Sequence, residues 1–148
     1  MNTDQDYKDV APESGVTVGI ADDAKMQLQS FVGYEGAPFK EMIDAFRFAV
    51  SLALAVNQDD PPALGSRPAT TLYNMGTFDN DQVFKEAFQV IAPEAFRQTG
   101  LTKLVRTYAE WGIEQMNREM LESGGEFSIP EVIEKLRSRL PANQWGSA

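Results

Sequence analysis

Cysteine and histidine are both absent from the 148 residues of this chain. Without cysteine there are no disulfides and no thiolate nucleophiles, and without histidine there is no imidazole to serve as a general base or as the usual zinc or iron ligand. Catalytic chemistry would have to rest on carboxylates, lysine, arginine or hydroxyl groups. Because these residues form no recognisable catalytic or phosphate-binding pattern, we expect no enzyme activity, no bound metal and no cofactor.

Long apolar runs and a positively charged leader are also missing. The first residues are polar and acidic. No run reaches the roughly 20 apolar residues that span a bilayer. We therefore expect neither a signal peptide nor a membrane span, and we expect the protein to work in the cytoplasm.

Positive charge is scarce. The chain has 13 Lys and Arg against 22 Asp and Glu, which gives a net charge of −9. The imbalance is concentrated in residues 1–60, where eleven acids stand against four bases. A field of this sign repels nucleic acid and anionic membranes, so direct nucleic-acid binding is disfavoured, although a local basic patch is left open.

The strongest positive signal is the stretch Pro38–Val56. Its first half repeats apolar residues at steps of three and four, which is the helical period. After Arg47 only Ser51 is polar up to Val56. A helix that is apolar on every side is buried, so the stretch predicts the central helix of a bundle, with Pro38 in its first turn.

Two short stretches, residues 16–20 and 70–74, have strand character. Two strands are not stable alone, so they would pair with each other or across a dimer while resting on helices. The fold class we predict is mainly α: a single-domain helical bundle around a buried central helix, with a minor two-stranded β element. Residues 1–14 would form a flexible acidic tail, 15–141 the domain and 142–148 a C-terminal tail.

Further helices are expected over residues 24–32, 83–91, 93–100, 102–123 and 129–140. Gly112 in the longest of them would permit a close helix approach. Caps are expected from Asp22 or Asp23, from Asp79 or Asn80, and from a capping box at Ser128–Glu131. Gly33 and Gly36 would end one helix and Gly124–Gly125 another. The last helix would bury a stripe of Ile129, Ile133, Leu136 and Leu140.

Acidic pairs offer no convincing metal site. Asp79–Asp81 resembles the start of a calcium loop, but the required Gly and Glu are replaced by Phe84 and Val90. Asp59 and Asp60 fit a solvated loop. The residues that could contact a partner are instead basic or aromatic. They are Arg67, Lys103, Arg106, Lys135, Arg137, Arg139 and Trp145.

Two stretches, Gly36–Ala49 (GAPFKEMIDAFRFA) and Arg106–Ile113 (RTYAEWGI), resemble a known family. The chain is similar, over roughly residues 16–122, to small accessory proteins of the Dnd type, which accompany bacterial DNA phosphorothioation and restriction gene clusters. The resemblance implies a non-catalytic accessory or adaptor protein of a DNA-modification or antiphage defence system. Its partners would be proteins of that system, with a homodimer left open. The leading strand of such proteins carries Lys or Arg, and residues 16–20 carry neither.

The order strand, helix, glycine turn, helix also fits a ribbon-helix-helix DNA-binding regulator, which we keep as the alternative. In such dimers the outward strand residues read the major groove. Here these would be Thr17 and Gly19, with Lys40 near the second helix. Thr17 and Gly19 are poor reading residues, and Pro38 has no N–H to offer a phosphate.

Overall fold

A computed structural model describes residues 16–63 and 69–137, and the structural statements below concern these residues. They fold into seven helices and one two-stranded antiparallel sheet, so the predicted fold class is confirmed. In chain order the elements are β1 (Thr17–Ile20), α2 (Asp22–Gln29), α3 (Met42–Asn57), β2 (Thr70–Asn74), α4 (Met75–Phe78), α5 (Val83–Ile91), α6 (Pro93–Thr99), α7 (Leu101–Glu122) and α8 (Ile129–Arg137).

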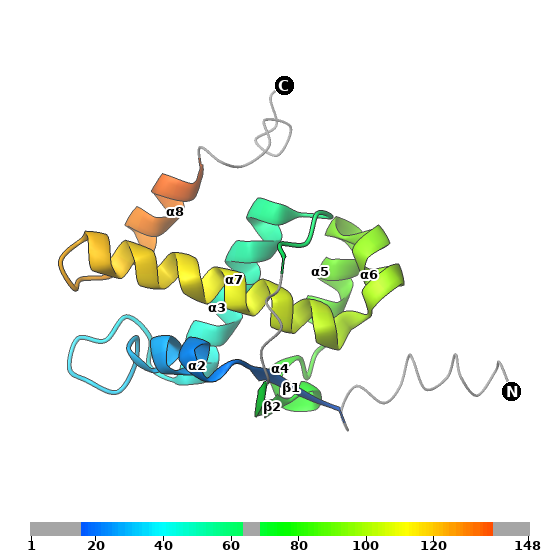
Figure 1. Cartoon of the computed structure of the whole chain (residues 1–148), viewed down its shortest axis with the longest axis horizontal. Coiled ribbons are helices and arrows are strands. Elements are labelled where there is room, and N and C mark those ends of the chain that lie inside the picture. Colours follow the sequence, from blue (N-terminus) through cyan, green and yellow to red (C-terminus); the bar gives the residue numbers. More distant parts are fainter. Residues whose placement is uncertain (1–15, 64–68, 138–148) are drawn as a thin grey trace, which may run out of the picture.

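The centre of the molecule is the crossing of α3 and α7, and Figure 1 shows α7 running across the whole described body. At the crossing, Gly112 lies directly against the backbone of Ala49. A Cβ atom on Gly112 would be only 2.1 Å from the Ala49 carbonyl oxygen. The two helices can therefore touch backbone to backbone only because position 112 has no side chain, as the sequence predicts.

Helix α3 is buried along most of its length, but not on every side. Phe46, Ala49 and Val50 are fully inaccessible to solvent. Ser51 and Ala55, in contrast, are exposed on the same helix. The prediction of burial all round is therefore wrong for this strip. The helix also starts later than expected, because it begins at Met42 and Pro38 precedes its first turn.

The two strands pair with each other in one chain. Thr17 lies opposite Asn74 and Ile20 opposite Thr70, with an irregularity between Val18 and Gly19. A Cβ on Gly19 would be 2.4 Å from the Thr70 carbonyl oxygen, so this close approach also requires glycine. The inner side chains Val18 and Ile20 are buried, and β1 rests on α7, which supplies the support that two strands need.

Aspartate side chains cap two helices in the second half of the fold. Both Asp79 oxygens accept backbone N–H bonds at the start of α5, from Phe84 and Lys85 at 2.9 Å each. This confirms a capping role for Asp79. Asp59 was expected to be merely solvated, but its carboxylate accepts the N–H of Ala95 at 2.9 Å and so reaches the first turn of α6. A negative charge at that end of a helix is favourable.

The predicted cap of α2 is confirmed only in part, because the Asp23 carboxylate accepts the Ala24 N–H at 2.8 Å but does so from within the helix. Ala21 takes the N-cap position, and Asp22 and Asp23 lie inside the first turn. The N–H of Ala21 is bound by Glu110 of α7 at 3.0 Å. The carboxylate of Asp22 accepts a hydrogen bond from the Thr70 hydroxyl instead. The Ala21 N–H and the Asp22 carboxylate are thus bound by residues that are distant in the sequence.

Tyr108 fastens α7 to the end of α3. Its ring is fully buried against Phe88, with ring centroids 5.1 Å apart, and its hydroxyl donates to the carbonyl of Gln58. Gln58 has a positive φ of 53° just after the last residue of α3. Burial, and to a lesser degree the charges of Asp59 and Asp60, raise the pKa of Tyr108 to about 12.

We predict that Gly112→Ala destabilises the fold by at least about 2 kcal/mol, because the forced separation of α3 and α7 outweighs the better helix propensity of alanine. Urea unfolding followed by circular dichroism measures this. The clash is with backbone atoms of Ala49. Adding Ala49→Gly should therefore not restore stability. An unchanged or higher unfolding midpoint for Gly112→Ala would contradict this packing.

We also predict that Tyr108→Phe costs about 1 kcal/mol at neutral pH, through the lost hydrogen bond. The pKa of Tyr108 is raised from 10.0 to about 12. The folded state therefore keeps its proton where the unfolded state loses it, and stability falls as the pH rises above 10. Urea unfolding at a series of alkaline pH values should show a shallower decline for Tyr108→Phe than for the unchanged protein. Equal slopes would rule out the buried hydroxyl as a cause.

Candidate docking groove

An apolar groove runs between α3 and α8. It has a volume of about 280 Å³, and its walls are almost entirely apolar. We call it the α3–α8 groove. It is lined by Phe48, Ser51, Leu52, Ala55 and Val56 of α3 and by Ile133, Leu136 and Arg137 of α8. It contains the strip of α3 that was expected to be buried.

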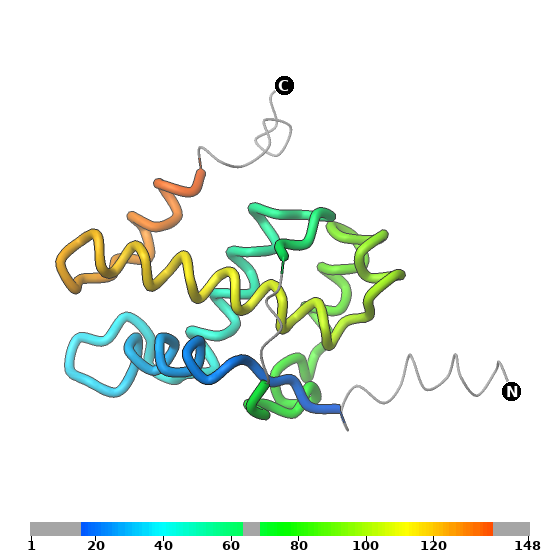
Figure 2. The backbone as a smooth tube through the Cα atoms, in the orientation of Figure 1, coloured from blue at the N-terminus to red at the C-terminus, as the bar shows by residue number. Residues whose placement is uncertain are grey.

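The wall formed by α8 is placed by the turn after α7. Gly124 and Gly125 have φ values of 77° and 98°, which glycine adopts without strain. The Gly125 N–H donates to the Met120 carbonyl at 2.8 Å, so the turn closes the end of α7 as predicted. Figure 2 shows the chain reversing here and returning as α8.

Phe127 fixes this turn to the core. Its ring lies 4.9 Å from Phe31, 6.2 Å from Phe39 and 6.4 Å from Phe48, measured between ring centroids. Phe48 also lines the groove. Phe48 therefore connects the aromatic cluster around Phe127 to the lining of the groove.

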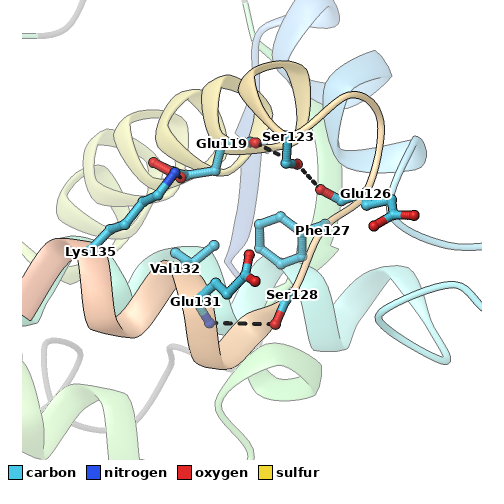
Figure 3. A pocket seen from close by; sticks show the side chains of 8 residues that line it. All are labelled: Glu119, Ser123, Glu126, Phe127, Ser128, Glu131, Val132 and Lys135. Carbon is cyan, nitrogen blue, oxygen red and sulfur yellow. Dashed lines mark hydrogen bonds and ion pairs between the residues drawn. The ribbon is translucent and has the colours of Figure 1, made fainter.

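Polar contacts hold the junction of α7 and α8, as Figure 3 shows. Lys135 of α8 reaches Glu119 of α7 at 2.8 Å, and this hydrogen bond raises the pKa of Lys135. The Ser128 hydroxyl accepts the Glu131 N–H at 3.4 Å, which is half of the predicted capping box. The space between these groups is about 10 Å³, room for at most one water. These contacts therefore connect α7 to α8, and the space between them is too small to bind a ligand.

The apolar face of α8 differs from the predicted stripe. Val132 and Leu136 are buried, whereas Ile133 is 48% exposed and lines the groove. Ile129 is half-buried, and Leu140 lies outside the described residues. Because α8 turns Val132 toward the core, Ile133 is left as an apolar side chain without full cover.

One charged side chain lines the groove. Arg137 is the last described residue of α8, and its guanidinium is 3.5 Å from Glu134. Both side chains of this pair are more than half exposed, so the pair adds little stability. The groove thus combines apolar walls with a positive charge at the end of α8.

The predicted partner-binding residues do not form one surface. Lys135 and Arg137 lie on α8, and Lys103 is exposed near the start of α7. Lys103 and the Glu119 that binds Lys135 are about 24 Å apart along α7. Arg67, Arg139 and Trp145 lie outside the described residues. Among the described members of the set, only Arg137 lines the groove.

Arg106 has a structural task. Its Nε donates to Glu110 Oε2 at 2.9 Å, and the same oxygen accepts the Ala21 N–H at 3.0 Å. Glu110 is 7% exposed. The pair therefore joins α7 to the link between β1 and α2, and a buried charge of this kind depends on its partners.

The residues expected to read DNA are not arranged as a ribbon. Thr17 and Lys40 are exposed, but Gly19 packs against the backbone of Thr70. In a ribbon-helix-helix dimer the first strand pairs with that of a second copy. Here β1 pairs with β2 of the same chain. This pairing does not favour the alternative.

A second hollow is polar and has a volume of about 220 Å³. It is lined by Asp23, Ala24, Gln27, Glu110 and Glu114. Glu110 is already held by Ala21 and Arg106. Within residues 16–63 and 69–137, no group of three or more acidic side chains is placed to hold a metal ion. Over the same residues, every helix is too short or too polar to cross a bilayer.

Comparisons with family models, with curated proteins and with solved structures each found no significant match to this chain. The sequence reasoning missed the groove residues Phe48, Leu52, Ala55, Val56 and Ile133. The sequence did contain a sign of the groove. Residues 48–56 of α3 are apolar on every side except at Ser51, and one short amphipathic helix such as α8 is too small to bury them completely.

We predict that Glu110→Ala destabilises the protein by about 3 kcal/mol, because it removes a charged hydrogen-bond acceptor from the buried Ala21 N–H and from the partly buried Arg106 guanidinium. Arg106→Ala should cost less, since the Ala21 bond survives. Lys103→Ala is the control on the same helix and should change stability by less than about 0.5 kcal/mol. Thermal unfolding of the three variants tests this order. If Glu110→Ala and Lys103→Ala unfold alike, the proposed tie between α7 and β1–α2 does not exist.

Proposed function

We propose that this chain is a non-catalytic accessory protein of a bacterial DNA phosphorothioation or antiphage defence system. It acts by binding a protein partner in the α3–α8 groove. The observation that carries the proposal is the groove itself, whose walls are apolar and border solvent. Large contiguous apolar patches are rare on the surface of folded proteins, and where they occur they commonly mark an interaction site.

The shape of the groove suits a helix. Its α3 wall extends from Phe48 to Val56, which is about 12 Å along the helix axis. An amphipathic helix that binds in a groove inserts side chains at positions i, i+4 and i+7. Those positions span about 10 Å. The groove can therefore take two turns of a partner helix, with an acidic partner residue placed near Arg137.

The assignment to a defence system rests on the sequence resemblance. The two resembling stretches, Gly36–Ala49 and Arg106–Ile113, include the residues that meet at the helix crossing, Ala49 and Gly112. They account for the position of α3 against α7. The groove lies along the C-terminal half of the same α3, so a protein that shares the crossing also shares the platform for the groove.

The mode of binding follows from the charge balance. The chain carries a net charge of −9. Of its predicted contact residues, Arg106 and Lys135 already hold structural carboxylates. Binding through apolar contacts needs neither of them. A protein partner therefore fits the surface better than a nucleic-acid backbone does.

The test is co-expression with the modification and restriction proteins of the gene cluster in the same bacterium. We predict a complex of defined mass, measured by size-exclusion chromatography with light scattering. Ala55→Glu should weaken it at least about tenfold, because the interface would bury an unpaired carboxylate. Val90→Glu is the matched control, since Val90 is a 79% exposed apolar residue outside the groove. It should leave the affinity unchanged.

Two results would count against the proposal in different ways. A complex that Ala55→Glu does not weaken would place the binding surface elsewhere. If no protein of the cluster binds and deletion of the gene leaves phosphorothioation and restriction unchanged, the link to the defence system fails. A mass corresponding to two copies of this chain, reduced to that of one copy by Ala55→Glu and not by Val90→Glu, would identify a homodimer as the occupant of the groove.

A further inference from the structure

The chain continues beyond α8 directly from the wall of the groove. Arg137 is both the last described residue of α8 and a lining residue of the α3–α8 groove. Residues 138–148 follow, with the sequence SRLPANQWGSA. Pro141 opposes a further helical continuation in the direction of α8, because proline removes a backbone donor and clashes with the preceding turn. These eleven residues therefore start beside an apolar surface.

Trp145 is within reach of that surface. It is the eighth residue after Arg137, so an extended chain spans up to about 26 Å between the two. The α3 wall is only about 12 Å long. A chain that turns back after Pro141 still has four residues, up to about 13 Å, in which to bring the indole ring to the groove lining beside Arg137.

The chemistry of the groove suits an indole ring. A tryptophan buries about 150–250 Å² of surface, and its N–H needs one acceptor. Leu52, Val56 and Ile133 supply apolar walls. Ser51 supplies an uncharged hydroxyl in the same lining. The other residues of the segment are small or polar apart from Leu140, so Trp145 is its main apolar anchor.

We propose that residues 138–148 bind in the α3–α8 groove of their own chain, with Trp145 inserted between α3 and α8. A segment tethered this closely acts at an effective concentration in the millimolar range. It therefore competes with any partner for the groove and lowers that partner's apparent affinity. This inference goes beyond the proposed function, because it concerns the isolated protein and holds whichever partner displaces the segment.

The test follows the Trp145 indole N–H in the ¹H–¹⁵N spectrum of the full chain. Trp145→Phe identifies its signal and separates it from that of Trp111. We expect the indole signal to be shifted from that of a free SRLPANQWGSA peptide and slow to exchange with solvent. Ala55→Glu should move it to the free-peptide position, whereas Val90→Glu should leave it in place. Ser51→Ala should shift it while keeping it protected by the apolar walls.

Three outcomes would overturn the proposal. The first is an indole signal at the free-peptide position in the unchanged protein. The second is a shifted signal that responds equally to Ala55→Glu and Val90→Glu. The third is a shifted signal that reverts on dilution together with a fall in molecular mass, which would assign the groove to a second copy. The first two outcomes do not bear on the co-expression test, so they leave the proposed function to be judged separately, whereas the third would also replace the protein partner in the groove with a second copy.

Discussion

The rest of the structure depends on the backbone contact between α3 and α7. Because Gly112 has no side chain, α3 comes close enough for the carbonyl of Ala49 to take the space of a Cβ atom. Helix α7 contacts the sheet, α2 and α6 along its length, while α3 passes through the core beneath it. Two long-range hydrogen bonds, from Tyr108 to Gln58 and from Ala21 to Glu110, add to this contact and join α7 to the end of α3 and to the start of α2.

The same contact determines where the groove lies. Once α7 covers the face of α3 that contains Ala49, the opposite strip with Ser51 and Ala55 must be covered by something else or face solvent. The only described element on that side is α8, which has nine residues and turns Val132 and Leu136 inward. Ile133 and Leu136 cover one edge of the strip and leave the other open. The groove therefore exists because α8 is too short to cover the whole apolar surface of α3.

Local signals in the sequence predicted much of the fold and little of the site. Gly112, the Gly124–Gly125 turn and the Asp79 cap were predictable because their effects need only nearby residues or a missing side chain. The bonds from Asp59 to α6 and from Glu110 to Ala21 were not, because they join residues 36 and 89 positions apart. The near-absence of polar residues showed that Phe48–Val56 is apolar, but it could not show which neighbour covers each face. The groove therefore appeared only in three dimensions.

The distribution of charge follows from how the basic residues are used. Several positive side chains are occupied within the fold: Arg106 and Lys135 bind glutamates, and Arg47 binds the carbonyls of Thr77 and Phe78 at the end of α4. A binding surface made from such residues would have to break contacts that hold the helices together. An apolar groove carries no such cost, and its interactions are screened by salt far less than ion pairs are. Arg47, Arg106 and Lys135 thus serve the fold, and contacts made in the apolar groove would leave all three in place.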